Sequence, residues 1–261
     1  MIQLEMIQKT KQIAENDANV SSVFMYGSFT KDEGDQYSDI EFYIFLKNKE
    51  NFSSESWISN IHPISLYFIN EYGSEVTIFE NMIRGEFHFL ATDKIDIIKS
   101  WDGLASFSEF DKMILVDKEG HLSKTLKEIK YKNPERITSE NISWLSKSLI
   151  NVLLTTSNLI KRQEFAHAYQ SLNSVQKYLL WLIRIHTSKT NHWETPTKNL
   201  EKDINDNWYA EYKRTTSKLN AIDIKSAFQY SIEISEKLFS ELKVESKIKE
   251  LLSIIKESNS K

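Results

Sequence analysis

The chain has 261 residues, enough for one large or two ordinary domains, and its apolar content of 40% and aromatic content of 12% are typical of globular proteins. Its 33 basic and 37 acidic residues give a net charge of −4, which argues against a general nucleic-acid-binding protein. There is no cysteine for disulfides or thiolate metal sites, no signal-peptide start and no apolar run of membrane-spanning length, so we expect a cytoplasmic protein without membrane or nucleic-acid partners.

The placement of glycine divides the chain into two parts. All six glycines lie within the first 120 residues, and none occurs from His121 to the end. Because glycine-dependent turns belong to sheets and loops, their absence favours long helices. We therefore predict an α+β fold, with a mixed sheet and helices in residues 1–130 followed by a helical bundle in residues 131–261.

Hydrophobic periodicity and turn signals predict the individual elements. In the first domain, helices are expected at Ile2–Ala14, from Ser53 to Ile61 and from Gly120 to Ile129, and strands at Val20–Tyr26, Asp39–Leu46, Ile64–Ile69, Glu75–Phe79, Arg84–Leu90 and Met113–Asp117. In the second domain, helices are expected at Ser139–Leu159, Glu164–His186, Trp208–Thr216, Ile222–Leu242 and Val244–Glu257.

The most informative motif joins Gly27-Ser28 to Asp39 and Glu41. An apolar strand that runs into Gly27-Ser28 offers backbone N–H groups to a phosphate, since glycine has no side chain in the way. Asp39 and Glu41 stand at i and i+2 of the next strand and so share one face. Carboxylates beside a phosphate cradle are ligands that Mg²⁺ prefers, so this arrangement predicts metal-assisted chemistry on a nucleoside triphosphate.

An ordinary alternative is a solvated strand edge that carries these acids without any ligand. The residues after Glu41 are apolar on both faces, which indicates a central buried strand and favours the metal site.

Several longer segments resemble the lincosamide nucleotidyltransferases, within the polymerase-β-like nucleotidyltransferase superfamily. The similar segments are Met25–Lys31, Gly34–Phe42, Ile83–Phe89 and Asn199–Ile204, and the resemblance extends over most of the chain, including its division into two domains. The resemblance implies adenylyl transfer from ATP to a hydroxyl of lincomycin or clindamycin, with two Mg²⁺ ions, which inactivates the antibiotic. It also implies a homodimer.

The resemblance gives roles to particular residues. Asp39 and Glu41 would hold the metal, and Gly27 and Ser28 would hold the β- and γ-phosphates. Glu86 would be the catalytic base that accepts the proton of the antibiotic's hydroxyl, with Glu75 as the fallback on a neighbouring strand. Arg84 and His88 flank Glu86 and could orient it or touch substrate, although a structural histidine is equally plausible.

Two basic residues of the helical half, Arg184 and Lys198, are separated like an arginine and a lysine that related aminoglycoside adenylyltransferases place on the triphosphate. The resemblance therefore assigns both to nucleotide binding. The alternative for Arg184, at the end of an apolar helix segment, is a salt bridge with Glu164 or Glu201.

Aromatic residues of the same half could line an apolar pocket for a substrate with a hydrocarbon arm, although most aromatics at helical spacing belong to the core. They are Trp144, Tyr178, Trp181, Trp193, Trp208 and Tyr212. Two alternative functions stay open, namely an aminoglycoside adenylyltransferase and a non-catalytic, antitoxin-like nucleotide binder.

Overall fold

The computed structural model describes residues 1–259 and divides into two compact units between Pro134 and Glu135. The first contains a mixed sheet with helices and the second is helical, so the predicted fold class is confirmed. The described residues include no helix that is both long and apolar enough to cross a membrane.

A six-stranded sheet organises the first unit, with the strand order β3-β4-β5-β2-β1-β6. Its strands are β1 (Val20–Met25), β2 (Ile40–Leu46), β3 (Ile64–Ile69), β4 (Glu75–Phe79), β5 (Arg84–Ala91) and β6 (Ile114–Asp117). The helical segments are α1 (Ile2–Asn16), η1 (Ser28–Lys31), α2 (Ser54–Ser59), η2 (Thr92–Trp101), α3 (Phe110–Met113) and α4 (His121–Lys127).

The two central strands, β2 and β5, are the parallel pair in this sheet, and the other neighbouring strands are antiparallel. Their register sets Ile40 opposite Gly85 and Glu41 opposite Glu86. Since residues paired across a ladder point to the same face, the side chains of Glu41 and Glu86 lie on one face of the sheet.

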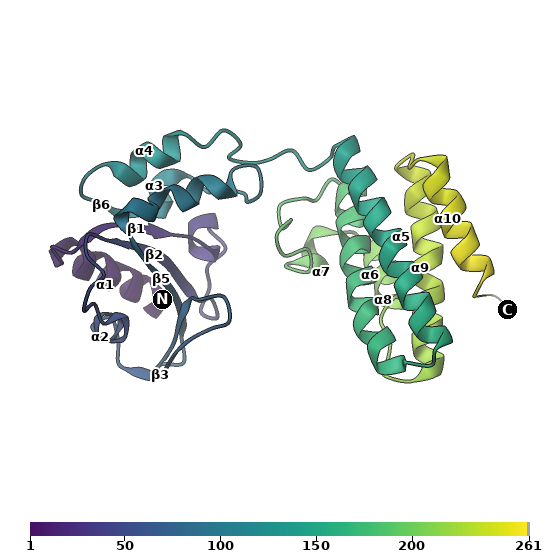
Figure 1. Ribbon diagram of the computed structural model, residues 1–261, viewed down its shortest axis with the longest axis horizontal. Helices are drawn as coiled ribbons and strands as arrows, with labels where there is room; N and C mark the ends of the chain where they lie inside the picture. Colours follow the sequence, from purple (N-terminus) through teal and green to yellow (C-terminus); the bar gives the residue numbers. More distant parts are fainter. Residues whose placement is uncertain (260–261) are drawn as a thin grey trace. The chain divides into compact units, whose positions relative to one another are not determined.

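Helices cover both faces of the sheet (Figure 1). On one face, α1 and α2 pack against inward-facing residues such as Phe42, Ile44 and Phe87. On the other face, η2 and α4 pack against Phe24 and Phe45. Glu41 and Glu86 belong to this second face, at the ends of β2 and β5 where each strand begins.

The second unit is a bundle of long helices with smaller helices at its side (Figure 1). Its helices are α5 (Ser139–Lys161), α6 (Phe165–His186), α7 (Leu200–Asp203), α8 (Asp206–Arg214), α9 (Ala221–Glu241) and α10 (Ser246–Glu257). Polar caps fix several starts: the side-chain oxygens of Thr138, Asn205 and Asn220 accept hydrogen bonds from backbone N–H groups in the first turns of α5, α8 and α9.

Four short elements were not anticipated. The 3₁₀ segments η1 and η2 and the short helix α7 lie where no element was expected, and α3 occupies residues directly before β6. Short 3₁₀ and single-turn helices carry little periodicity in sequence, and tertiary contacts decide whether they form.

Candidate active site

The Gly27-Ser28 turn follows β1 directly. Gly27 has a φ of 81° and a ψ of −159°, a conformation that residues with a side chain rarely adopt. A Cβ atom built on Gly27 would lie 1.6 Å from Oε2 of Glu41, so the carboxylate lies directly against the backbone of this turn. A residue with a side chain could not replace Gly27 without moving the Glu41 carboxylate.

Asp39, the first residue of the strand expected from the sequence, lies immediately before β2, which begins at Ile40. Its carboxylate accepts a hydrogen bond of 2.6 Å from Nη1 of Arg84, and Nη2 of the same guanidinium donates to Glu86 over 2.6 Å. Arg84 is the first residue of β5. The structure thus brings Asp39, Arg84 and Glu86 together, and we call these three residues the acid–arginine cluster.

Electrostatics in this cluster favour the charged forms. Burial raises the pKa of Glu86, but the hydrogen bonds from Arg84 and Ser74 outweigh it, so this pKa lies below its ordinary value. Burial also opposes the charge on Arg84, yet its contacts with Glu86 and Asp39 leave the pKa of the guanidinium raised. Near neutral pH Glu86 is therefore a carboxylate and Arg84 carries its positive charge.

His88 lies on the same face as Glu86, two residues along β5. Its Nε2 is 3.5 Å from Oε1 of Glu86 and 3.1 Å from the hydroxyl of Tyr26, and its ring stacks on Tyr43 with centroids 4.1 Å apart. Burial lowers the pKa of His88 despite the nearby charge of Glu86, so the imidazole is neutral near pH 7. His88 therefore lies in contact with Glu86.

Tyr26 and Tyr43 contact His88, next to Glu86, and the sequence patterns did not identify them. Burial and the charges of Glu86 and Glu41 raise the pKa of Tyr26, while burial and Glu86 raise the pKa of Tyr43. Both phenols therefore stay protonated. The strand alternation that placed Glu86 and His88 together would also have identified Tyr43, but only the pairing of β2 with β5 shows that it stacks on His88.

Glu75, the fallback base, lies elsewhere. In the β4–β5 ladder Glu75 pairs with Phe87, and Val76 pairs with Glu86. Glu75 therefore points to the opposite face of the sheet from Glu86. Burial raises its pKa. The expectation that the same alternation would offer Glu75 to the same site is wrong, because the antiparallel register is offset by one residue.

The residues expected to hold a divalent cation fit that role. Asp39 and Glu41 supply carboxylate oxygens, and the Glu41 carboxylate fills the space that a side chain at residue 27 would need. Across residues 1–259, however, no three histidine, aspartate or glutamate side chains are already gathered as a cation-binding cluster. Arg84 contacts Asp39 instead.

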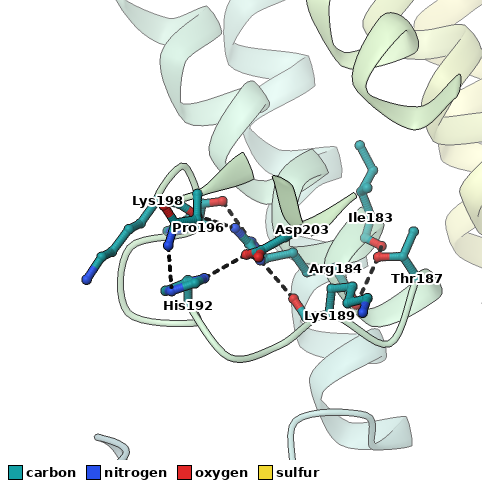
Figure 2. A network of polar contacts seen from close by, with 9 residues as sticks. Ile183, Arg184, Thr187, Lys189, His192, Pro196, Lys198 and Asp203 are labelled. Atoms are coloured by element: carbon teal, nitrogen blue, oxygen red, sulfur yellow. Dashed lines mark hydrogen bonds and ion pairs between the residues drawn. The ribbon is translucent and has the colours of Figure 1, made fainter. Parts of the chain in front are cut away.

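Arg184 of the second unit is fully buried. Its Nε donates to the carbonyl of Pro196 over 2.8 Å, Nη1 to the carbonyl of Lys189 over 2.9 Å and Nη2 to the carbonyl of Lys198 over 2.7 Å. Figure 2 shows that all three acceptors belong to the loop after α6, residues 189–198, which surrounds the guanidinium. Arg184 therefore fastens this loop to helix α6.

The acidic partner of Arg184 is Asp203, rather than Glu164 or Glu201. Nη1 of Arg184 lies 2.8 Å from Oδ2 of Asp203, and Nδ1 of His192 lies 2.6 Å from the same oxygen (Figure 2). Burial alone would raise the pKa of Asp203, but Arg184 and His192 lower it. Asp203 ends α7, the helix that was not anticipated, although the segment Asn199–Ile204 had been singled out by resemblance.

Lys198 belongs to the loop that Arg184 fastens, and its main-chain carbonyl accepts one of the bonds from the guanidinium. The two basic residues expected to bind nucleotide are thus connected to each other, through the backbone of Lys198. They differ in exposure, since Arg184 is fully buried and Lys198 is partly exposed.

Four of the six aromatic residues singled out in the helical half form one cluster on α5, α6 and the following loop. Trp181 lies with its ring centroid 6.1 Å from Trp144, 5.7 Å from Tyr178 and 5.8 Å from Trp193. Trp144 is 52% exposed. Trp193 and Trp208 are buried and belong to the bundle core.

Comparison with known proteins finds two family models on this chain. Residues 8–99 match the family described as "Polymerase beta, Nucleotidyltransferase", and residues 138–260 match "Lincosamide nucleotidyltransferase-like, C-terminal domain". Among curated proteins, none matches the chain.

Solved structures give a weaker likeness. An aminoglycoside 6-adenyltransferase from Bacillus subtilis is 14% identical, with 98% of each chain covered and a TM-score of 0.46. A nucleotidyltransferase-like protein from Exiguobacterium sibiricum is 15% identical, with 95% of this chain and 87% of that chain covered and a TM-score of 0.35. The two family matches identify residues 8–99 as a polymerase-β-type nucleotidyltransferase domain and residues 138–260 as a C-terminal domain of the lincosamide nucleotidyltransferase-like family.

Proposed function

We propose that this nucleotidyltransferase transfers an adenylyl group from ATP to a hydroxyl of a lincosamide antibiotic such as lincomycin or clindamycin, and so confers resistance. The observation that carries the chemistry is the parallel register of β2 and β5, which sets Glu41 beside Glu86 on one face, next to the Gly27-Ser28 turn. The substrate class rests on the match of residues 138–260.

Asp39 and Glu41 are the proposed ligands of Mg²⁺. When bound, the metal would neutralise the triphosphate and support attack and departure at the α-phosphorus. Gly27 and Ser28 are the proposed contacts of the β- and γ-phosphates, through the backbone of the turn and the Ser28 hydroxyl at the start of η1. Lys198 is the proposed basic contact for the triphosphate, while Arg184 holds the loop that carries it.

Glu86 is the proposed base. The substrate hydroxyl gives its proton to the Glu86 carboxylate, its oxygen forms a bond to the α-phosphorus, and the bond from that phosphorus to pyrophosphate breaks with inversion. His88, neutral and stacked on Tyr43, keeps the Glu86 carboxylate in place. A base held this way contributes about 10²- to 10⁴-fold to the rate in enzymes of known mechanism.

In the aromatic cluster, Trp144, Tyr178 and Trp181 are exposed or partly exposed and supply an apolar surface suited to the hydrocarbon arm of a lincosamide. Aminoglycosides are polycations and favour a strongly acidic pocket instead.

We also propose that the protein forms a homodimer. Sedimentation velocity tests this directly, since one chain has a mass of 30.6 kDa.

The deciding experiment incubates the full chain with ATP, Mg²⁺ and, separately, lincomycin, clindamycin and a panel of aminoglycosides, and reads the products by mass spectrometry. An adenylylated lincosamide, formed only with Mg²⁺, is the expected result. An adduct with aminoglycosides alone would identify the other substrate class. ATP binding without any adduct would instead support a non-catalytic nucleotide binder.

A further inference from the structure

Arg84 connects two carboxylates that the proposed mechanism uses for different purposes. It contacts Asp39, a proposed metal ligand, through Nη1, and Glu86, the proposed base, through Nη2, each over 2.6 Å. Because a guanidinium group is planar and rigid, Nη1 and Nη2 move together, so a movement that breaks one contact also disturbs the other.

The charges explain why the guanidinium lies there. Asp39 and Glu86 are held close together by their shared partner, and two carboxylates at such a distance repel each other unless a cation lies between them. A divalent cation bound by Asp39 would stand beside the positive charge of Arg84 and would be repelled by it. Arg84 and the metal therefore compete for Asp39.

The guanidinium is also able to leave. The side chain of Arg84 is 37% exposed, so it can exchange its carboxylate partners for water without being left unpaired in an apolar interior. Arg84 is the first residue of β5. Its contacts are with two carboxylates, whereas the buried Arg184 also donates to three main-chain carbonyls.

We propose that Arg84 is a built-in counter-ion that occupies Asp39 in the metal-free protein and is displaced when the divalent cation binds, which at the same time releases Glu86. This inference rests on the proposed function, because the cation is the one required for nucleotidyl transfer. Arg84 is a positioning residue in this scheme: it keeps the base paired until the metal arrives.

The test is calorimetric titration of the full chain with MnCl₂ in the absence of nucleotide. Arg84→Met removes the competing charge, and Arg84→Lys keeps the charge but cannot bridge two carboxylates. We expect Arg84→Met to bind Mn²⁺ about 5- to 20-fold more tightly than the wild type, within the usual range for two coupled equilibria. Arg84→Lys should fall between them.

The matched control is Lys112→Met. Lys112 is an exposed cation of the same unit that pairs with Asp32 and lies outside the acid–arginine cluster. Its removal lowers the charge of the unit by the same amount as Arg84→Met, so an equal gain in Mn²⁺ affinity would mean that overall charge, and not displacement at Asp39, is responsible. We expect a change below about twofold, as for a screened surface charge.

Unchanged or weaker Mn²⁺ binding in both Arg84 variants would overturn the inference while leaving the proposed function intact. If neither the wild type nor any variant binds Mn²⁺, with or without ATP, the metal requirement of the proposed function fails too.

A second measurement applies if Arg84→Met does not fold. In the ¹⁵N-labelled wild type, the arginine Nε–H resonance that is missing in Arg84→Lys should shift on titration with Mg²⁺. A resonance that stays in place at saturating Mg²⁺ would also overturn the displacement.

Discussion

Arg84, which flanks the candidate base, and Arg184, a candidate nucleotide contact, occupy opposite environments. Arg84 is 37% exposed and shares two carboxylates that are themselves 38% and 20% exposed, whereas Arg184 is 0% exposed and donates to three carbonyls and one carboxylate. A guanidinium committed to carbonyls fixes a chain segment. One that pairs only with half-exposed acids can change partners, and this property suits a reacting site.

The largest expected effect concerns Glu86, a partner of the more exposed Arg84. We expect Glu86→Gln to lower kcat by about 10²- to 10⁴-fold, because the amide cannot accept the proton. The affinity for ATP should change little. Glu75→Gln is the matched control, since Glu75 lies on the other face of the sheet, and steady-state kinetics of the two variants on one lincosamide would measure both.

A Glu75→Gln variant that loses turnover, beside a Glu86→Gln variant that keeps it, would move the base to Glu75 and contradict the register argument.

The opposite side of the comparison predicts a stability effect. Arg184→Met leaves Asp203 without its main cation and three carbonyls without donors, and should lower the free energy of unfolding by about 3–5 kcal/mol. Urea denaturation measures this loss. Arg162→Met, which alters an exposed arginine at the end of α5, should stay within about 0.5 kcal/mol of the wild type.

Equal stability of the two variants would show that the buried network around Arg184 is dispensable. A raised KM for ATP in Arg184→Met, without any loss of stability, would point back to a direct nucleotide contact.

Gly27→Ala tests how much the close contact between the Gly27-Ser28 turn and Glu41 contributes to stability. The new methyl group would collide with the Glu41 carboxylate, and the alanine backbone would have to adopt a φ of 81°. We therefore expect a loss of about 1–3 kcal/mol in stability. Gly73→Ala is the control, because Gly73 has a φ of 80° but no atom near its would-be Cβ. Thermal unfolding of both variants separates backbone strain from the close approach to Glu41.

If the two alanine variants lose equal stability, the contact between Gly27 and Glu41 has no energetic weight of its own.

The pH dependence of stability is the smallest expected effect. The pKa of His88 is below 6.5 in the folded protein because of burial, so the unfolded chain binds the proton first. Stability is therefore full above pH 6.5 and falls as the pH drops through the folded-state pKa of His88. The pKa of Glu86 is also lowered, which adds a second loss below pH 4.5.

We expect His88→Gln to remove the first of these losses, measured as the slope of unfolding free energy against pH in EDTA. A slope between pH 6.5 and 5 equal to that of the wild type would assign the effect to another group.

Local sequence patterns were sufficient for much of this fold. The alternation in Arg84–Leu90 correctly put Glu86 and His88 on one face, and the expected strand at Ile64–Ile69 was found with the same bounds. What the sequence could not supply is pairing between distant segments. The Arg84–Asp39 contact and the stacking of His88 on Tyr43 both depend on how β2 aligns with β5.

The partner of Arg184 shows the same limit in the helical unit. Glu164 and Glu201 were reasonable from composition, but the loop after α6 folds back so that Asp203 and His192 reach the guanidinium. Such a return depends on many weak contacts, and no short-range pattern encodes it.

The parallel alignment of β2 with β5 has a consequence for changes in chain length. These strands are joined by a long excursion through β3 and β4, whose turn at Asn70–Gly73 is exposed, so residues added at that turn leave the alignment untouched. A single residue inserted within β5 ahead of Glu86 would exchange the two faces of the strand beyond it and bury the carboxylate among Phe42 and Phe79. The enzyme should therefore tolerate length variation in one hairpin and almost none a few residues later.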